Sequence, residues 1–241
     1  MAEPIDCCSS PSNTDSRARY RPLCGGISAA HYLVGAGTLG AIVHDLETGD
    51  PLLLSNNHTF ANADSVSDRR ANKGDPILQP SIGDEGIYPD DVVAYLERWI
   101  PFDPTADNYV DAAIARPIAG MLSDEMILSQ GAGSEFIIPE GVQACCHSRV
   151  RKFGRTGGET VGKIIDCNYS TSIPYPSGIT VRYVDQILIQ IDTCAGDSGS
   201  IYLDDNDRVI GLHCGGTSVN GIRYAVANKI ENVCKLLRIS I

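Results

Sequence analysis

The sequence lacks any apolar stretch approaching the length of about 18 residues that a membrane-spanning helix needs, so we expect no membrane association. It is also poor in basic residues, because 19 Lys and Arg stand against 30 Asp and Glu and leave a formal net charge of −11. Binding to nucleic acid requires clustered cations that neutralise phosphates. The one dense basic run, residues 149–152, is too short to supply them, and we expect no nucleic-acid partner.

No basic stretch followed by an apolar one opens the sequence, so no signal peptide is predicted. The nine cysteines are an odd number, and two pairs, at positions 7–8 and 145–146, are direct neighbours that would bridge each other only with strain. We therefore expect mostly reduced thiols in a cytoplasmic protein. An exported protein that has lost its leader is the alternative.

A zinc site is the other use that the cysteines suggest. Cys145, Cys146 and His147 lie together, and Cys167 follows them, but this spacing is irregular for a zinc ligand set. Buried thiols on strands are the better interpretation. We expect neither a metal ion nor a cofactor.

Short apolar runs separated by Gly, Asn, Asp and Pro dominate the sequence from residue 22 onward. Runs of this length and spacing predict an all-β protein, either a sandwich or a barrel. Helical spacing of apolar residues occurs only near the end, where it predicts a helix from about residue 225 to residue 237. The runs expected to form strands are Leu39–Val43, Pro51–Leu54, Ala112–Ala115, Val161–Ile165, Ile187–Ile191 and Arg208–Leu212.

The segment Asp192–Ser200 carries the strongest chemical signal. It contains the tetrapeptide Gly-Asp-Ser-Gly, in which glycines frame Ser198 and permit a tight turn with an exposed hydroxyl. The N–H groups of Gly196 and Ser198 can then converge on the oxyanion that forms during acyl transfer. A glycine-rich β-turn without a catalytic role is the alternative interpretation.

Two further segments place a histidine and an acid beside apolar runs. His58 follows one such run, and Asp111 opens another. Either residue alone is more often structural, but the chain order His58, Asp111, Ser198 is that of the chymotrypsin-type triad. An α/β-hydrolase needs the order serine, acid, histidine, and its strand–helix alternation is absent here.

Four segments of the chain resemble the trypsin-like serine proteases, in particular the bacterial glutamyl endopeptidases and related intracellular proteins. They are Leu53–Phe60, Tyr109–Ala115, Asp192–Ser200 and Val209–Gly216, and the turn Lys152–Gly158 is similar to the entry of the second barrel in that family. The resemblance spans roughly residues 22–238. It implies an all-β fold of two six-stranded antiparallel β-barrels packed face to face, with a C-terminal helix.

The resemblance also divides the chain into parts. We expect a flexible tail over residues 1–21, a first barrel over 22–120 with His58 and Asp111, a crossing over 121–140, and a second barrel over 141–241 with Ser198 and the C-terminal helix.

The family implies a role for each member of the triad. Ser198 is the expected nucleophile and His58 the expected base, with Asp111 orienting the base. Asp103 and Asp107 are weaker candidates for the acid, because neither directly opens an apolar strand.

Asp197 needs a cationic partner, because a buried and unpaired carboxylate costs several kcal/mol. In digestive relatives this partner is an N-terminal amine that activation cleavage exposes. Some bacterial relatives use an internal basic residue instead, and the matching position here is Lys152. We therefore expect a Lys152–Asp197 pair and no obligatory activation cleavage.

The residues expected at the substrate pocket favour two different specificities. Asp192 stands where trypsin has the carboxylate that selects Lys and Arg, whereas Thr193 and His213 match the glutamyl endopeptidases and suit an acidic side chain. Gly215 and Gly216 continue the strand that lines the cleft. We expect an acidic residue before the cleaved bond, with a basic residue as the alternative. A structural core histidine is the alternative role for His213.

We therefore expect a serine endopeptidase that acts on protein or peptide substrates, and the alternative is an inactive protease-like domain that binds or scaffolds. Cys214 departs from the family, because trypsin has a hydrogen-bonding serine there and a thiol is a poorer donor. A cysteine protease centred on Cys194 or Cys214 ranks third, because neither has the glycine frame. An intracellular protease also needs restraint, either by a tight cleft or by a regulatory partner protein.

Overall fold

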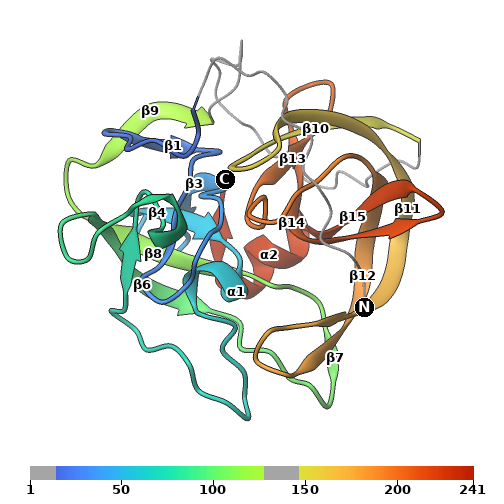
Figure 1. Ribbon diagram of the computed structural model, residues 1–241, viewed down its shortest axis with the longest axis horizontal. Helices are drawn as coiled ribbons and strands as arrows, with labels where there is room; N and C mark the ends of the chain where they lie inside the picture. Colours follow the sequence, from blue (N-terminus) through green and yellow to red (C-terminus); the bar gives the residue numbers. More distant parts are fainter. Residues whose placement is uncertain (1–14, 128–146) are drawn as a thin grey trace.

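A computed structural model describes residues 15–127 and 147–241. Two seven-stranded sheets account for most of the strands. They lie side by side, with the blue-to-green first half of the chain in one and the yellow-to-red second half in the other (Figure 1).

The first sheet is antiparallel throughout. Its buried face forms a core of its own that includes Leu53, Ile77 and Leu96. A separate parallel pair, β1 (Leu23–Gly25) and β9 (Leu122–Ile127), packs beside it. The strand order of the sheet is β16 (Ile239–Ser240), β3 (Ala41–Asp45), β4 (Pro51–Ser55), β8 (Ala113–Pro117), β6 (Val92–Trp99), β5 (Pro76–Leu78) and β2 (Ala30–His31).

The second sheet closes on itself, because its strands β11 and β12 also pair with each other. Ile164, Ile189 and Tyr202 lie in the core that it encloses. Its strand order is β11 (Gly158–Pro174), β10 (Arg149–Gly154), β13 (Ile201–Leu203), β14 (Val209–Val219), β15 (Ile222–Lys229), β12 (Thr180–Gln190) and β7 (Asp107–Asn108).

The predicted fold class, an all-β protein with two barrels and a C-terminal helix, is confirmed. Each sheet has seven strands rather than six because a two-residue strand is added to it: β16 joins the edge of the first sheet, and β7 pairs in parallel with β12. The described helical segments are α1 (Asn57–Phe60), η1 (Ile82–Asp84) and α2 (Ile230–Leu237). None of them has the length and apolar character that crossing a membrane would take.

The C-terminal helix begins later than its apolar spacing predicts. Residues 225–229 belong to β15, where Ala225, Val226 and Ala227 pair with strands on both sides. A continuous buried run satisfies a central strand as well as a helix, so spacing alone could not separate the two. The helix proper starts at Ile230.

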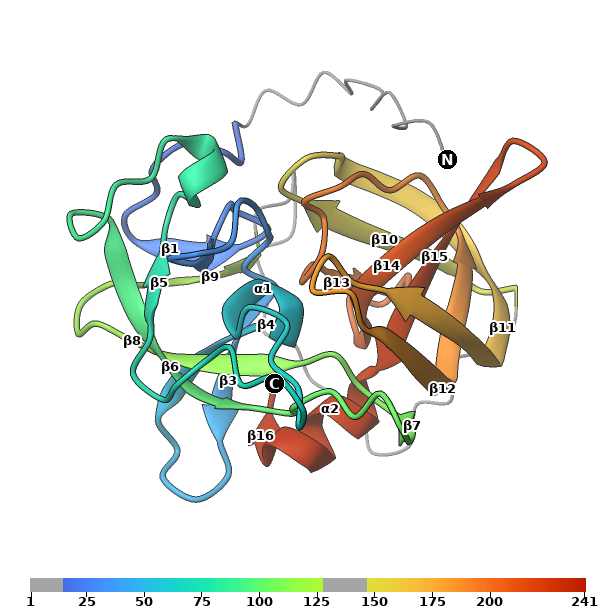
Figure 2. The same ribbon diagram turned by 60° about the horizontal axis from the view of Figure 1, so that its bottom comes forward.

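One apolar core is shared by the two barrels. It contains Val43 and Leu54 from the first sheet, Phe153 and Leu212 from the second, and Val233 from α2. Figure 2 shows α1 between the two sheets, with α2 below it. The core therefore joins the two barrels, and α2 contributes to it.

Part of the predicted tail is docked on the folded protein. Ser16 is 6% exposed, and its carbonyl accepts a hydrogen bond from the Ser28 amide at 2.8 Å. Residues 1–14 and 128–146 lie outside the described residues, and they include most of the predicted crossing together with Cys145 and Cys146.

Candidate active site

His58 and Asp111 meet at one end of the first sheet. His58 follows β4, and Asp111 precedes β8, the strand that pairs with β4 in antiparallel register. This register delivers both side chains to the same edge of the sheet. His58 Nδ1 lies 2.5 Å from Asp111 Oδ2, although the residues are 53 positions apart in the chain.

The Asp111 side chain is fully buried, and donors surround its carboxylate. The His58 backbone amide donates to Oδ1 at 3.1 Å, and the Tyr175 hydroxyl donates to Oδ2 at 2.9 Å. The backbone on either side of the carboxylate is also held, because Asn228 accepts from the Asp111 amide and Asn56 donates to its carbonyl. The acid therefore has a fixed orientation toward the imidazole.

Tyr175 supplies the donor that the sequence leaves in question at position 214. The Cys214 thiol donates to the Val226 carbonyl at 3.3 Å instead of to Asp111. Burial raises the pKa values of Cys214 and Tyr175 well above their usual range, so both keep their protons. The Tyr183 hydroxyl lies 2.8 Å from that of Tyr175 and extends the buried network.

Ser198 lies on a turn that packs against the first barrel. Gly199 has a φ of +95°, which favours glycine, and a Cβ there would lie 2.2 Å from Ser55 Oγ. The Ser198 carbonyl accepts from the Thr38 amide at 2.8 Å. This packing ties the serine turn to the strand end that leads to His58.

Four groups expected to take part in catalysis form no hydrogen bond within the described residues. Neither the Ser198 hydroxyl nor His58 Nε2 forms a hydrogen bond there, and the amides of Gly196 and Ser198 donate to no described acceptor. Catalytic hydrogen bonds are often long in free enzymes and tighten only when substrate binds.

Asp197 is paired with Lys152, the partner that the family resemblance implies. Lys152 Nζ is 2.7 Å from Asp197 Oδ2, and both side chains are 0% exposed. The amides of Thr156 and Gly157 donate to Oδ1, and that of Cys194 to Oδ2. Burial alone would raise the pKa of Asp197, but the Lys152 charge and these donors hold it below its usual value. The carboxylate thus anchors the turn just before Ser198.

A cavity of about 230 Å³ opens beside Ser198. Four of the five residues expected to line the substrate pocket do so, and the rest of the wall, apart from Ser198, adds four residues that were not expected there. The predicted lining residues are Thr193, His213, Gly215 and Gly216, and the four further ones are Cys194, Ala195, Thr217 and Arg223.

Asp192 does not line this cavity, which differs from its predicted place. Its side chain is 69% exposed and faces a neighbouring surface hollow, where Arg223 Nε lies 3.8 Å from its Oδ1. The side chain after β12 turns outward, because the preceding residue, Ile191, is buried in the core of the second barrel.

His213 is buried between two hydroxyl groups. Thr193 Oγ1 lies 2.9 Å from its Nε2, and the Tyr202 hydroxyl lies 2.9 Å from its Nδ1. Burial, aided by the charge of Lys152, lowers the pKa of His213 to about 3, so the imidazole is neutral at neutral pH. The charge of His58 contributes to the same shift.

Sequence reasoning missed Tyr175 and Arg223. Tyr175 lies between two prolines at a hairpin turn, a signal that predicts the turn but not a contact with an acid 64 positions away. Arg223 follows a Gly-Ile pair in the β14–β15 hairpin, and nothing in its neighbourhood indicates that it reaches a cavity wall.

No protein-family model and no curated protein matches the sequence. Among solved structures, the chain is similar to the chymotrypsin of Cellulomonas bogoriensis, at 17% identity and a TM-score of 0.61 over 90% of this chain and 97% of that one. It is also similar to a glutamic-acid-specific serine protease said to use a novel histidine triad in substrate binding. The identity is 16% and the TM-score 0.65, over 91% and 100% of the two chains. These likenesses show that the chain has the chymotrypsin fold.

Proposed function

We propose that this chain is a serine endopeptidase with Ser198 as nucleophile, His58 as general base and Asp111 as the residue that orients the base. The contact of 2.5 Å between His58 Nδ1 and Asp111 Oδ2, together with the position of Ser198 in the wall of a cavity, carries this proposal. Nδ1 donates to the carboxylate, so Nε2 keeps its lone pair for the serine proton. The fold shared with serine proteases supports the same assignment.

The reaction follows from these roles. Ser198 Oγ attacks the carbonyl carbon while its proton passes to His58 Nε2, and the N–H groups of Gly196 and Ser198 stabilise the oxyanion. His58 then gives the proton to the leaving amine, the C–N bond breaks, and an acyl-enzyme remains. Water attacks the ester with His58 again as base, which releases the acid product and restores Ser198.

The cavity beside Ser198 suits an acidic side chain. Burial raises the pKa of Tyr202, so its hydroxyl keeps a proton to donate to His213 Nδ1, 2.9 Å away; we assign the tautomer in which it does so and the imidazole proton is on Nε2. In that tautomer Nε2 donates to Thr193 Oγ1, whose own proton points to Asp197 Oδ2 across a long contact of 3.5 Å and can turn to a substrate carboxylate. Arg223 adds a positive charge to the wall, and the carboxylate of Asp192 faces away.

A fluorophosphonate probe tests the proposed nucleophile directly. We expect one covalent adduct, which mass spectrometry maps to Ser198, and which the substitution His58→Ala suppresses. An untouched Ser198 under all pH conditions would contradict the enzyme and favour the alternative of an inactive protease-like binding domain.

Removing the cavity's positive wall should shift specificity. On peptides that differ only by Glu or Gln before the cleaved bond, we expect Arg223→Gln to lower the Glu/Gln ratio of kcat/KM about tenfold, because the guanidinium charge favours the carboxylate. His213→Ala should shift preference in the same direction. The measurement is kcat/KM on the matched peptide pair.

Arg182→Gln is the matched control for Arg223→Gln. Arg182 also pairs with an exposed aspartate, Asp107 at 3.3 Å, but it lies outside the cavity. Its substitution should leave the Glu/Gln ratio unchanged. A wild-type profile dominated by Lys or Arg, or an unchanged ratio in both cavity variants, would reject acidic specificity.

A further inference from the structure

Arg155 and Thr156 contact the serine turn from behind, although the proposed chemistry gives them no role. They lie in the turn between β10 and β11. Thr156 Oγ1 donates to the Ala195 carbonyl at 2.7 Å. A Cβ on Gly196 would lie 2.6 Å from Thr156 Oγ1 and 2.9 Å from Arg155 Nη1. Both side chains therefore pack directly against Gly196.

The Thr156 hydrogen bond sets the direction of the Gly196 amide. The Ala195 carbonyl and the Gly196 N–H belong to one peptide unit, and in a trans peptide they point in opposite directions. Holding the carbonyl on the Thr156 side therefore turns the N–H to the other side. If this peptide rotated by half a turn, a carbonyl oxygen would take the place of the N–H and repel an oxyanion.

Arg155 determines which way the Thr156 hydroxyl donates. Arg155 Nη1 lies 2.9 Å from Thr156 Oγ1, and a guanidinium can only donate. The hydroxyl therefore accepts from Arg155, and its own proton goes to the Ala195 carbonyl. Without Arg155, the hydroxyl would be free to rotate.

Asp84, from η1 in the first barrel, fixes Arg155 in turn. Arg155 Nε donates to Asp84 Oδ2 at 2.6 Å, and Nη2 pairs with Oδ1, which makes a two-point contact. The two side chains are 11% and 5% exposed. Ser28 and Ser81 also donate to Asp84 Oδ2. The guanidinium is thus held from the opposite barrel.

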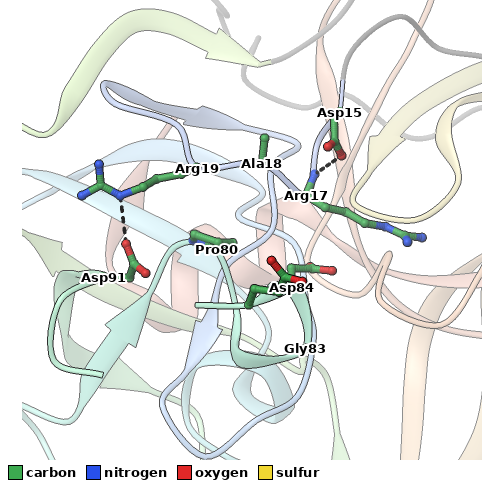
Figure 3. A pocket seen from close by; sticks show the side chains of 9 residues that line it. Asp15, Arg17, Ala18, Arg19, Pro80, Gly83, Asp84 and Asp91 are labelled. Carbon is green, nitrogen blue, oxygen red and sulfur yellow. Dashed lines mark hydrogen bonds and ion pairs between the residues drawn. The ribbon is translucent and has the colours of Figure 1, made fainter. Parts of the chain in front are cut away.

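The backbone of Arg155 is bound to the first half of the chain as well. Its amide donates to Thr38 Oγ1 at 3.1 Å, and the same Thr38 hydroxyl donates to the Gly196 carbonyl at 2.8 Å. Its carbonyl accepts from Ser16 Oγ at 2.7 Å. Figure 3 shows the docked segment of residues 15–19 beside the loop that carries Asp84.

The geometry points to a positioning chain, Asp84–Arg155–Thr156, that holds the oxyanion hole open from the first barrel. This inference rests on the proposed protease function and deepens it. None of the three residues touches the reacting atoms, so they are positioning residues. Their effect is to keep the Gly196 N–H aimed at the place where the oxyanion forms.

The substitution Thr156→Val tests the positioning chain, because it removes the hydroxyl and keeps the shape. We expect a loss of about 10- to 100-fold in kcat, less than the loss of one whole oxyanion donor, with KM little changed. Affinity for a peptide aldehyde, which forms an oxyanion on the enzyme, should fall by the same factor. Thr156→Ser should recover most of the loss.

Thr48→Val is the matched control for Thr156→Val. Thr48 Oγ1 also binds a backbone group, the Asp50 amide at 3.2 Å, but it lies on an exposed turn. This variant should match the wild type. A purely structural role for Thr156 would lower the Tm without a selective loss of aldehyde affinity, and that result would overturn the inference.

Amide hydrogen exchange gives a readout that does not depend on hydrolysis. In the peptide 192–200, the amides of Cys194, Asp197, Gly199 and Ser200 are bonded, and we expect them to exchange faster in Thr156→Val than in Thr156→Ser. Unchanged exchange together with unchanged kcat would refute the positioning chain. If the wild type fails to react with the fluorophosphonate, the protease proposal fails, while exchange still decides whether Thr156 holds the turn. If Thr156→Val does not fold, Arg155→Lys takes its place. Lysine lacks the guanidinium that contacts both Asp84 and Thr156, and the same kinetic and exchange measurements apply.

Discussion

Replacing Ser198 with alanine should lower peptide hydrolysis by roughly 10⁴- to 10⁶-fold, the range that removal of a serine nucleophile produces. The effect is large because the proposed mechanism depends on this hydroxyl, and the neighbouring Ser200 hydroxyl is engaged with the Asp197 carbonyl at 2.7 Å. The free energy of unfolding should change by less than about 0.5 kcal/mol, because the hydroxyl makes no hydrogen bond in the described part of the chain. Steady-state kinetics and urea unfolding measure the two quantities.

Ser67→Ala controls for the loss of a serine hydroxyl elsewhere on the protein. Ser67 is exposed, and among the described residues its hydroxyl reaches only Ser65, at 3.4 Å. This variant should keep wild-type activity. Residual hydrolysis by Ser198→Ala above about one part in a thousand, in protein free of contaminating protease, would show that another residue is the nucleophile.

The substitution Lys152→Met should destabilise the fold by about 3–5 kcal/mol, because it leaves the Asp197 carboxylate buried without its cation. The two side chains are 0% exposed and 2.7 Å apart, so water cannot replace the ammonium group without rearrangement. Urea unfolding at fixed pH measures the loss. Activity should fall too, because Asp197 anchors the turn before Ser198.

The pH dependence of the same variant has a defined sign. In the wild type, the pKa of Asp197 in the folded protein is lower than that of an aspartate in the unfolded chain. The Lys152–Asp197 pair therefore stabilises the fold at pH values above the unfolded-chain pKa. This contribution is lost as the pH falls through the pKa of the folded protein. In Lys152→Met burial dominates and raises the folded pKa. Stability of the variant should therefore decline as the pH rises from the ordinary pKa toward the raised one.

A double variant separates the charge from the packing. Lys152→Met with Asp197→Asn removes both charges and keeps the amide donors around position 197, so it should recover much of the lost stability and lose the pH dependence. A single variant that unfolds at the same urea concentration as the wild type at pH 5 and pH 8 would contradict a buried charge pair.

Local patterns in the sequence were sufficient where the chemistry depends on neighbours in the chain. The glycines around Ser198 predict the serine turn, whereas Lys152 as the partner of Asp197 follows only from the family resemblance. His58 and Asp111 were singled out because each lies beside a short apolar run and because they precede Ser198 in the chain order of the triad. The pairing of β4 with β8, which brings these two side chains together, joins strands that are far apart in the chain.

Contacts that depend on the length of a strand could not be predicted from local patterns in the sequence. Tyr175 reaches Asp111 only because β11 and β12 extend as a long hairpin. Asp192 points outward because Ile191, the residue before it, is buried in the core of the second barrel. Ala225, Val226 and Ala227 form a short apolar run that suits a strand or a helix, and only their pairing partners decide between the two.

The two-residue strand β16 has a consequence for the order of folding. It covers the outer edge of β3, and the neighbouring Leu237 carbonyl accepts hydrogen bonds from Arg98 in β6. During synthesis, the first barrel therefore emerges with one edge bare until residues 239–240 have left the ribosome. Completion of this edge therefore waits until the second barrel has been translated, so the first barrel gains its last strand only at the end of synthesis.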